Sequence, residues 1–386
     1  MTDRSLAGER PDVLVCGASF AGLAVARELA GSGADVLVLD RAEIGSNPTS
    51  ACAAPTAWLE ALGLGTAIRQ ELRCMRFTTP HGSVRYRLPW SWAAFDYATL
   101  CRLLWEQAEA RFEVALVKGR SGEGVRTDRG EIHADLVVDA LGWRRVLAAS
   151  PVKPPPRRRP GGAEWVWPET QDPSISRGLE VHPDGTGIDL DVVVDRSLVR
   201  RGYCWRVPAD DHVRVGAGSY DPRVPVKTPT AKIAARLGLP AVRHQGNWFP
   251  HRLRPAVEDG VFFVGDSAGH CFALSGEGIR PAFYFGIACG RELRRVTAGE
   301  ATPDEARARY AAFGEAHRRG FEITYALQWA LPELPPRLLT VVLRVLGAQP
   351  LVRALFGWYL NQAHPSFVER EAAQPGAHRT ALTRVN

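Results

Sequence analysis

Residues 12–22 read DVLVCGASFAG, a short apolar run followed by two glycines. The run predicts a buried strand, Gly17 allows a tight turn, and residues 23–31 continue as a helix. The free N–H groups at the start of such a helix can bind a pyrophosphate. A second apolar run, 35–39, ends in Asp40, where a carboxylate accepts hydrogen bonds from a ribose. The segment predicts a dinucleotide-binding βαβ unit, although a glycine-rich turn in an unrelated α/β fold would share the pattern.

The rest of the chain predicts that this unit belongs to a discontinuous domain. Strands are expected at 136–140 and 261–264, helices at 58–72, 95–111, 230–237 and 278–297, and a hairpin around His81-Gly82. Residues 151–162 are rich in proline and arginine and predict a linker, and the strand-like runs that follow are 176–182, 187–194, 202–208 and 212–220. We therefore predict an α/β protein with three parts: a Rossmann-like domain (1–74, 93–150 and 250–300), an inserted mixed β-sheet substrate domain (75–92 and 151–249), and a C-terminal helical cap (301–386).

The composition excludes several classes of protein. The 386 residues carry 48 basic and 42 acidic side chains, a net charge of +6, and the basic residues are scattered, so nucleic-acid binding is not expected. Seven cysteines without a C-x-x-C pair predict neither a disulfide framework nor a metal site. Residues 1–10 lack an apolar signal core, and prolines interrupt 323–346, so no spanning helix is expected. These features predict a cytoplasmic protein.

Three later motifs carry a family resemblance. Residues 265–279 read GDSAGHCFALSGEGI, 135–142 read DLVVDALG, and 203–208 read YCWRVP. They resemble the GD-x-A-G, P-x-x-G-E-G-I, D-A-T-G and Y-x-W-x-F-P motifs of the geranylgeranyl reductase family of FAD-dependent oxidoreductases, which have the larger p-hydroxybenzoate-hydroxylase-like fold. Ala273, Leu141 and Val207 stand where that family usually has Pro, Thr and Phe. The resemblance covers residues 11–300.

This resemblance implies that the chain is an enzyme with FAD as its cofactor. Asp266 would bind the ribityl chain, and Gly278 and Ile279 would place a helix N-terminus beside the flavin pyrimidine. Arg102 is expected to replace an arginine that the family has near the start of the 95–111 helix, where this chain has Trp92. The complete set of expected cofactor-binding residues is Gly17, Ser19, Phe20, Ala21, Gly22, Asp40, Arg41, Ala51, Cys52, Arg102, Val117, Gly142, Gly265, Asp266, Gly276, Gly278 and Ile279.

Aromatic residues of the inserted domain are the candidates for substrate contact. In this fold the inserted sheet lies over the flavin, so its aromatic side chains can line an apolar cavity. Ordinary sheet core is the alternative for each of them. The candidates are Trp165, Trp167, Tyr203, Trp205 and Trp248.

Three residues are candidates for proton or thiol chemistry. His270 is a candidate proton donor because histidine titrates near neutral pH. Glu277 precedes a predicted helix, where a carboxylate acts either as a catalyst or as a stabilising end charge. Cys52 lies where the family often has a cysteine under the flavin, and it is either a functional thiol or an inert buried one.

The expected function is the reduction or dehydrogenation of C–C or C=C bonds in a large apolar, isoprenoid or polycyclic substrate, by hydride transfer at flavin N5. The alternatives are a single-component FAD-dependent monooxygenase, a redox-neutral carotenoid-type cyclase, and a non-catalytic prenyl-binding carrier. No second dinucleotide motif is present, so NAD(P)H or another electron donor would bind transiently. The segments 321–346 and 351–360 mix apolar residues with Arg and Trp, which suits a packed cap and equally a peripheral contact with an anionic membrane. The oligomeric state stays open.

Overall fold

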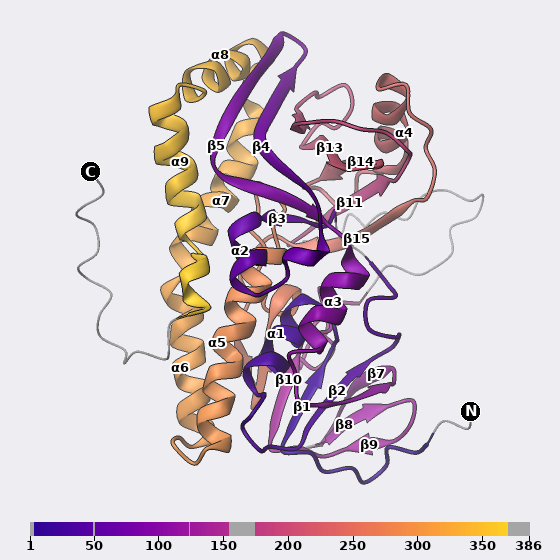
Figure 1. The fold of residues 1–386 in the computed structure, drawn as a ribbon, viewed down its shortest axis with the longest axis vertical. Helices are drawn as coiled ribbons and strands as arrows, with labels where there is room; N and C mark the ends of the chain where they lie inside the picture. Colours follow the sequence, from indigo (N-terminus) through magenta and orange to yellow (C-terminus); the bar gives the residue numbers. More distant parts are fainter. Residues whose placement is uncertain (1–3, 49–50, 123, 154–173, 370–386) are drawn as a thin grey trace.

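The predicted βαβ unit forms the centre of a six-stranded sheet in the computed structural model, which describes residues 4–48, 51–122, 124–153 and 174–369 (Figure 1). The strand order is β16-β17-β10-β1-β2-β6, and β16 alone among these strands runs antiparallel to its neighbour. The strands are β1 (Val13–Cys16), β2 (Val36–Asp40), β6 (Arg111–Val114), β10 (Leu136–Asp139), β16 (Val257–Glu258) and β17 (Val261–Phe263). Strands that are far apart in the sequence, at 13–16 and 261–263, therefore belong to one sheet.

This sheet is covered on both faces, which explains its continuous apolar strands. Val13 and Val15 face a core shared with the helices α1 (Phe20–Glu28), α3 (Tyr97–Trp105) and α5 (Ile279–Thr297). Leu14 and Cys16 face a small three-stranded sheet made of β7 (Val117–Ser121), β8 (Gly124–Thr127) and β9 (Glu131–Ile132). Helices α1 and α5 approach closely because Gly286 has no side chain: a Cβ there would lie 2.7 Å from the carbonyl oxygen of Ala21.

A second, eight-stranded sheet has the order β15-β11-β14-β13-β12-β4-β5-β3. Its strands are β3 (Ala53–Pro55), β4 (Ile68–Thr79), β5 (Gly82–Phe95), β11 (Ile175–Val181), β12 (Leu190–Val193), β13 (Gly202–Ala209), β14 (His212–Ser219) and β15 (Gln245–Pro250). The expected hairpin forms, with Thr79 paired to Gly82. One face packs its valines and alanines against α4 (Lys227–Arg236), which leaves the other face for a different partner.

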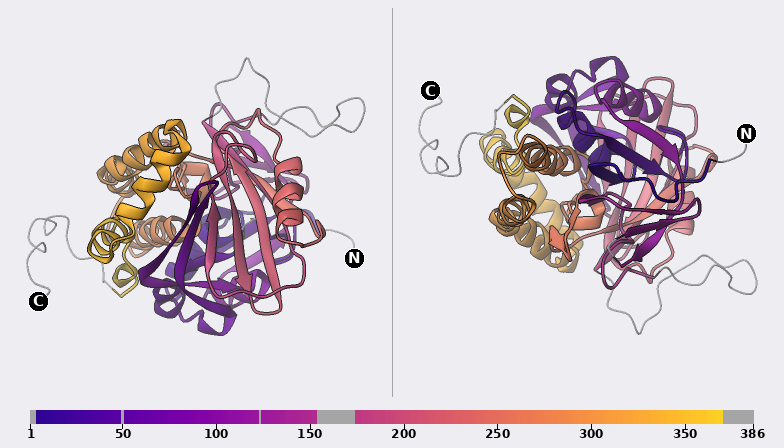
Figure 2. Two further views of the ribbon diagram at one scale, coloured as in Figure 1. Left: turned by 90° about the horizontal axis from the view of Figure 1, so that it is seen from above. Right: turned by 90° about the horizontal axis from the view of Figure 1, so that it is seen from below.

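The C-terminal helices supply that partner, as Figures 1 and 2 show. They are α6 (Pro303–Ala316), α7 (Arg318–Ala330), α8 (Pro336–Leu346) and α9 (Gln349–Asn361). Helix α6 packs beside α5, and α8 and α9 contact the β4–β5 hairpin. The Tyr86 hydroxyl donates to the carbonyl of Leu343 at 2.6 Å, and the hydroxyls of Thr79 and Thr340 lie 2.7 Å apart. Helices α7, α8 and α9 thus lie over the open face of the eight-stranded sheet, whereas α6 lies beside α5.

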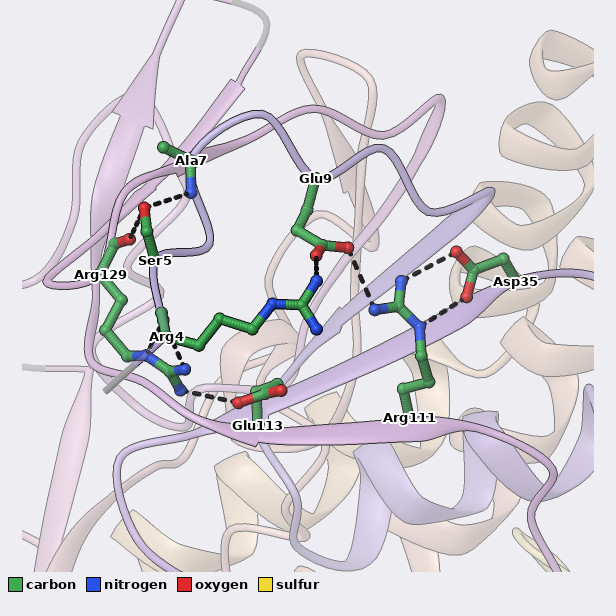
Figure 3. A network of polar contacts seen from close by, with 8 residues as sticks. All are labelled: Arg4, Ser5, Ala7, Glu9, Asp35, Arg111, Glu113 and Arg129. Atoms are coloured by element: carbon green, nitrogen blue, oxygen red, sulfur yellow. Dashed lines mark hydrogen bonds and ion pairs between the residues drawn. The ribbon is translucent and has the colours of Figure 1, made fainter. Parts of the chain in front are cut away.

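A polar network anchors the N-terminal segment to the six-stranded sheet (Figure 3). Arg111 on β6 donates to both carboxylate oxygens of Asp35, at 2.9 and 2.8 Å, and to Glu9 at 3.0 Å. Arg129 donates to Glu113 at 2.8 Å and to the backbone carbonyl of Arg4. The segment before β1 is therefore held at the sheet edge by contacts with β6 and with the loop after β8.

Two predicted helices are shorter than expected. The 58–72 helix is replaced by α2 (Thr56–Ala61), a single turn of 3-10 helix and the start of β4 at Ile68, because those residues pair with β5. The 95–111 helix ends at Trp105, since Arg111 begins the strand that pairs with β2. Strands β4 and β5 extend on both sides of the 75–92 segment assigned to the substrate domain, and the domain boundaries stay predictions. Of the predicted linker, 154–162 lies outside the described residues.

Candidate active site

A cavity of about 970 Å³ lies where the six-stranded sheet, the eight-stranded sheet and the C-terminal helices meet. The glycine turn after β1 and the loop before α5 form one end of its lining. Strands β12 and β13 and helices α7, α8 and α9 supply its apolar walls, with Leu190, Val192, Val207, Leu339, Leu343, Leu346, Val352 and Phe356. The cavity thus joins the predicted dinucleotide motif to a large apolar space.

The turn after β1 is built for close backbone approach. Gly17 has φ +114°, and a Cβ there would lie 2.3 Å from the carbonyl oxygen of Ala140. No side chain caps the N-terminus of α1, because the hydroxyl of Ser19 accepts a hydrogen bond from Tyr97 at 3.1 Å. The open N–H groups at this helix end suit an anion such as a pyrophosphate. Asp40 accepts from the backbone N–H of Ala18 at 2.8 Å and lines the same end of the cavity.

A second helix N-terminus opens into the cavity at α5. Gly278 precedes the helix without a side-chain cap and lines the cavity with Gly276 and Ile279. A Cβ on Gly278 would lie 3.6 Å from Oδ1 of Asp266, so this carboxyl stands beside the helix entry. Burial raises the pKa of Asp266 to about 6, and the positive charge of Arg254 opposes this rise. Two helix ends and two acidic side chains therefore surround one end of the cavity, which fits a dinucleotide with hydroxylated and anionic groups.

Most of the expected cofactor-binding residues line this cavity. They are Gly17, Ser19, Phe20, Ala21, Asp40, Arg41, Ala51, Val117, Gly142, Gly265, Asp266, Gly276, Gly278 and Ile279. Gly22 lies behind the turn, where a Cβ would collide with the carbonyl oxygen of Gly17. Arg102 is in the wrong place for the expected contact: its side chain is 59% exposed and pairs with Glu106 at 2.6 Å on the outer face of α3. Trp92, by contrast, lines the cavity.

Cys52 is buried beside the cavity in a strained backbone position, with φ +49°. Its carbonyl accepts from Arg214 at 2.8 Å, and its neighbours Ala51 and Ala53 line the cavity. Burial raises the pKa of the Cys52 thiol to about 12, so the sulfur stays protonated at neutral pH. Since the thiolate is the nucleophilic form, this environment favours an inert thiol.

His270 does not lie where a substrate proton donor would have to lie. Its ring is fully buried and stacks on Phe285 with centroids 3.8 Å apart, and Nδ1 accepts from the backbone N–H of Gly265 at 3.1 Å. It is not among the residues that line the cavity. Burial lowers its pKa well below the usual value, so the ring is neutral near pH 7. The histidine packs the loop against α5. Because its ring does not line the cavity, it is not placed to donate a proton to a substrate there.

Glu277 lines the cavity, but its carboxylate is already fully engaged. Arg280, which is completely buried, donates to both carboxylate oxygens at 2.7 and 2.8 Å. The hydroxyl of Tyr359 on α9 donates to the same carboxylate, and Arg280 also donates to the carbonyl of Leu360 at 2.9 Å. Glu277 and Arg280 thus fasten the end of α9 to the loop before α5, which favours a structural charge over a catalytic one.

The predicted aromatic candidates within the described residues line the cavity. Trp248, Tyr203 and Trp205 are part of its wall, whereas Trp165 and Trp167 lie outside the described residues. The indole of Trp205 lies flat on β11 and β14, where three glycines leave room for it. A Cβ on Gly216 would lie 2.3 Å from Cζ2 of Trp205, and those on Gly218 and Gly178 would lie 3.2 and 3.4 Å from the ring.

Two cavity residues of interest were not identified from the sequence: Glu180 on β11 and Tyr359 on α9. Glu180 could have been identified as a candidate, because an acidic residue in the middle of a strand-like run is unusual where its side chain is buried. Tyr359 offered no signal, because its partner Glu277 is 82 residues away in the chain. Among the described residues no cluster of His, Cys, Asp and Glu side chains could hold a metal ion.

A sheet that is parallel except for β16, two helix N-termini open to one cavity, and a second sheet over that cavity form an arrangement suited to binding a dinucleotide. No protein-family model matches the chain. A geranylgeranyl bacteriochlorophyll reductase-like protein from Thermoplasma acidophilum has a TM-score of 0.75 at 16% identity, over 94% of this chain and 98% of that one. A probable FAD-dependent monooxygenase from Pseudomonas aeruginosa has a TM-score of 0.63 at 18% identity, covering 87% of this chain and 100% of that one.

Two further similarities agree with these. Anhydrotetracycline hydroxylase from Streptomyces rimosus has a TM-score of 0.60 at 20% identity, over 91% of this chain and 76% of that one. The chloroplastic geranylgeranyl diphosphate reductase of Nicotiana tabacum is 35% identical over 97 residues, which are 23% of this chain and 20% of that protein. The chain therefore has the fold of the geranylgeranyl reductase-like flavoproteins and FAD-dependent monooxygenases, and the predicted fold class and resemblance are confirmed.

Proposed function

We propose that this protein is an FAD-dependent oxidoreductase that acts on C–C or C=C bonds of a large apolar substrate, such as an isoprenoid chain or a polycyclic compound. The observation that carries the proposal is the continuity of the cavity. One space joins the open N-termini of α1 and α5 to apolar walls formed by the eight-stranded sheet and the C-terminal helices. A cofactor held at the first end would face a substrate held at the second.

The residues at the first end suit FAD. The N–H groups after Gly17 would bind the pyrophosphate, Asp40 would accept from the adenosine ribose, and Asp266 would accept from the ribityl chain. The N-terminus of α5 would stabilise negative charge on the flavin pyrimidine. When bound, FAD supplies the transfer of a hydride or of electrons, while the chain's residues bind, orient and shield the reactants.

The main alternative is a single-component FAD-dependent monooxygenase, and the similarity to two hydroxylating or monooxygenase structures favours it as the second candidate. The two functions differ in how they use air. A monooxygenase consumes NAD(P)H rapidly with O₂ only when its substrate is present. A reductase transfers its electrons to the substrate without oxygen.

The test is the visible spectrum of the purified protein, followed by anaerobic reduction with NADPH, with and without geranylgeranyl diphosphate or a polycyclic phenol. We expect a yellow protein with one non-covalent FAD per chain and re-oxidation of the flavin by an apolar substrate in the absence of air. Substrate-dependent oxygen uptake would favour the monooxygenase. Colourless protein that takes up no added FAD would contradict both.

We further propose that the surface of α7, α8 and α9 docks on anionic membranes. Large apolar side chains are exposed there: Leu327, Leu338, Val341, Val345, Leu351, Leu355 and Trp358. Leu327, Leu355 and Trp358 also line the cavity, so this surface is continuous with the apolar space. Arg337, Arg344 and Arg353 are exposed beside it and complement an anionic headgroup layer. A lipophilic substrate could then enter from the bilayer.

No single helix of the described residues has the length and hydropathy of a membrane span. The segments Pro336–Leu346 and Gln349–Phe367 have this length and hydropathy only when they are taken together. The chain bends by 92° at the junction between them.

A further inference from the structure

The sheet wall of the cavity carries a carboxylate, Glu180, that has no part in the proposed binding of FAD. Residues alternate between the two faces of β11, so Gly178 and Glu180 share the face that lines the cavity, while Val181 packs in the core under α4. The side chain of Glu180 is 3% exposed. A buried carboxylate is costly unless hydrogen bonds compensate it, so its partners determine what it can do.

Two fixed partners hold the carboxylate of Glu180. Nε1 of Trp205 donates to Oε2 at 3.0 Å, and Nε2 of His182 lies 2.8 Å from Oε1. Trp205 cannot swing away easily, because its indole fits into the space left by Gly178, Gly216 and Gly218. At this residue of the cavity lining, the carboxylate is therefore held by an indole on one oxygen and an imidazole on the other.

His182 connects this carboxylate to solvent. Its side chain is 19% exposed, and its ring stacks on His212 with centroids 6.2 Å apart. Nδ1 of His212 lies 2.9 Å from Oδ1 of the exposed Asp211. An imidazole can donate from one ring nitrogen and accept at the other, so His182 can pass a proton between solvent and the Glu180 carboxylate.

The other ionisable groups near Glu180 are occupied. Arg214 on the neighbouring β14 donates to the carbonyls of Ala51, Cys52 and Phe95. Burial raises the pKa of the Cys52 thiol and keeps it protonated. Arg214 opposes this rise, and Glu180 adds to it. On the other side, β15 presents the uncharged Gln245 opposite Glu180.

Glu277 offers a contrast within the same cavity. Its partner Arg280 is a guanidinium, which has no acceptor and donates to both carboxylate oxygens. The partner of Glu180 is instead an imidazole, whose nitrogen can either donate a proton or accept one. Of these two glutamates, Glu180 is the one that can deliver a proton.

We propose that Glu180 is the catalytic acid that protonates the substrate in the cavity, and that His182 is a positioning residue that returns the proton from solvent. The proposal rests on the proposed reduction of a C=C bond. In that reaction the π bond breaks and two C–H bonds form. One hydrogen arrives with an electron pair from reduced flavin, which is oxidised. The other arrives as a proton from the Glu180 carboxyl, and the carboxylate left behind is reprotonated through His182.

The test compares Glu180→Gln with Glu180→Asp and with the control Glu113→Gln. Glu113 is likewise a glutamate with a fixed partner, Arg129, but it lies on β6 and does not line the cavity. Each holoenzyme is measured for FAD content, for anaerobic flavin reduction by NADPH, for the pH dependence of substrate reduction, and by infrared difference spectroscopy between acidic and alkaline buffer without substrate.

We expect E180Q to bind FAD and accept electrons normally, to reduce substrate roughly 100-fold more slowly or worse, and to lack one titrating carboxyl band. E180D keeps the band and part of the rate, and E113Q keeps the wild-type pH profile. We expect His182→Gln to shift both the pH dependence of substrate reduction and the midpoint pH of the carboxyl band. A purely structural role of His182 would not shift the two together.

The outcomes separate this proposal from the proposed function. Full turnover of FAD-loaded E180Q with an unchanged pH profile would overturn the role of Glu180 and leave the oxidoreductase intact. Failure of the wild-type chain to bind FAD would overturn the proposed function. In that case the carboxyl band in the infrared difference spectrum still tests whether Glu180 holds a proton. If E180Q kept this band, the band would belong to another group, and the role of Glu180 would be refuted as well.

Discussion

At the scale of single residues, Asp266 shows how burial sets the charge of a carboxyl. Burial raises its pKa to about 6, so in the empty site it is charged above that pH and neutral below it. The charged form is the stronger hydrogen-bond acceptor for a ribityl hydroxyl. We therefore expect FAD affinity to fall as the pH is lowered through about 6, in a titration followed by flavin fluorescence.

Substitution of the same residue tests the assignment directly. Asp266→Ala should weaken FAD binding at pH 8 by about 1–3 kcal/mol, which is roughly 5- to 150-fold in Kd, because a hydrogen bond to a charged acceptor is lost. It should also remove the pH dependence. Asp304→Ala, in an exposed carboxylate on α6, serves as the control. Unchanged affinity in D266A would show that Asp266 does not contact the cofactor.

Trp205 and the glycines beneath it form another test at this scale. Trp205→Ala removes a cavity wall and the donor to Glu180, so we expect impaired turnover, with apolar contact worth a few kcal/mol lost, and unchanged FAD content. Gly216→Ala retains Trp205 but should act similarly, because the new Cβ, 2.3 Å from Cζ2 of Trp205, would displace the ring. Rates and unfolding temperatures distinguish the roles: normal turnover with a much lower Tm would assign Trp205 to the core.

At the scale of elements, the exposed apolar side chains of α8 and α9 allow the proposed membrane docking to be tested. Replacing Val341 and Val345, both exposed on α8, by Asp should reduce co-sedimentation with anionic vesicles several-fold and leave the fold intact. Neither residue lines the cavity, so turnover of a water-soluble short-chain substrate should be unaffected. Ile188→Asp, at an exposed apolar position outside these helices, is the control. Vesicle binding equal to wild type in the double variant would place any membrane contact elsewhere.

At the scale of the whole molecule, the cavity is bordered by segments from nearly the full length of the chain. A ligand that binds the folded state stabilises it, by about 2.7 kcal/mol at a hundredfold excess over Kd. We expect added FAD to raise the Tm of cofactor-free protein by a few degrees and to sharpen unfolding into one transition. The shift is read by differential scanning fluorimetry. ADP, which has the adenosine and pyrophosphate but no flavin, should give a smaller shift, and no shift with either ligand would contradict the site.

The strands, the hairpin and the glycine turn could be predicted from the sequence because each depends on neighbouring residues. Residues 12–40 contain the strand, the turn, the helix and the terminal acid of one local unit, and the motif at 265–279 contains its own turn and helix start. Helix ends were less predictable. Ile68 and Arg111 enter strands because distant partners, β5 and β2, supply hydrogen bonds that local helical preference does not offer.

The sequence by itself determined the fold class, the dinucleotide motif and most of the residues at that end of the cavity. Tertiary structure alone decided which polar side chains reach the cavity. His270 lies within the 265–279 motif yet its ring packs on Phe285 of α5, Arg102 turns to solvent, and Glu180 is brought beside Trp205 and His182. The physical reason is that spacing along the chain fixes the local backbone, whereas the role of a titratable group depends on its burial and on partners from other strands and helices.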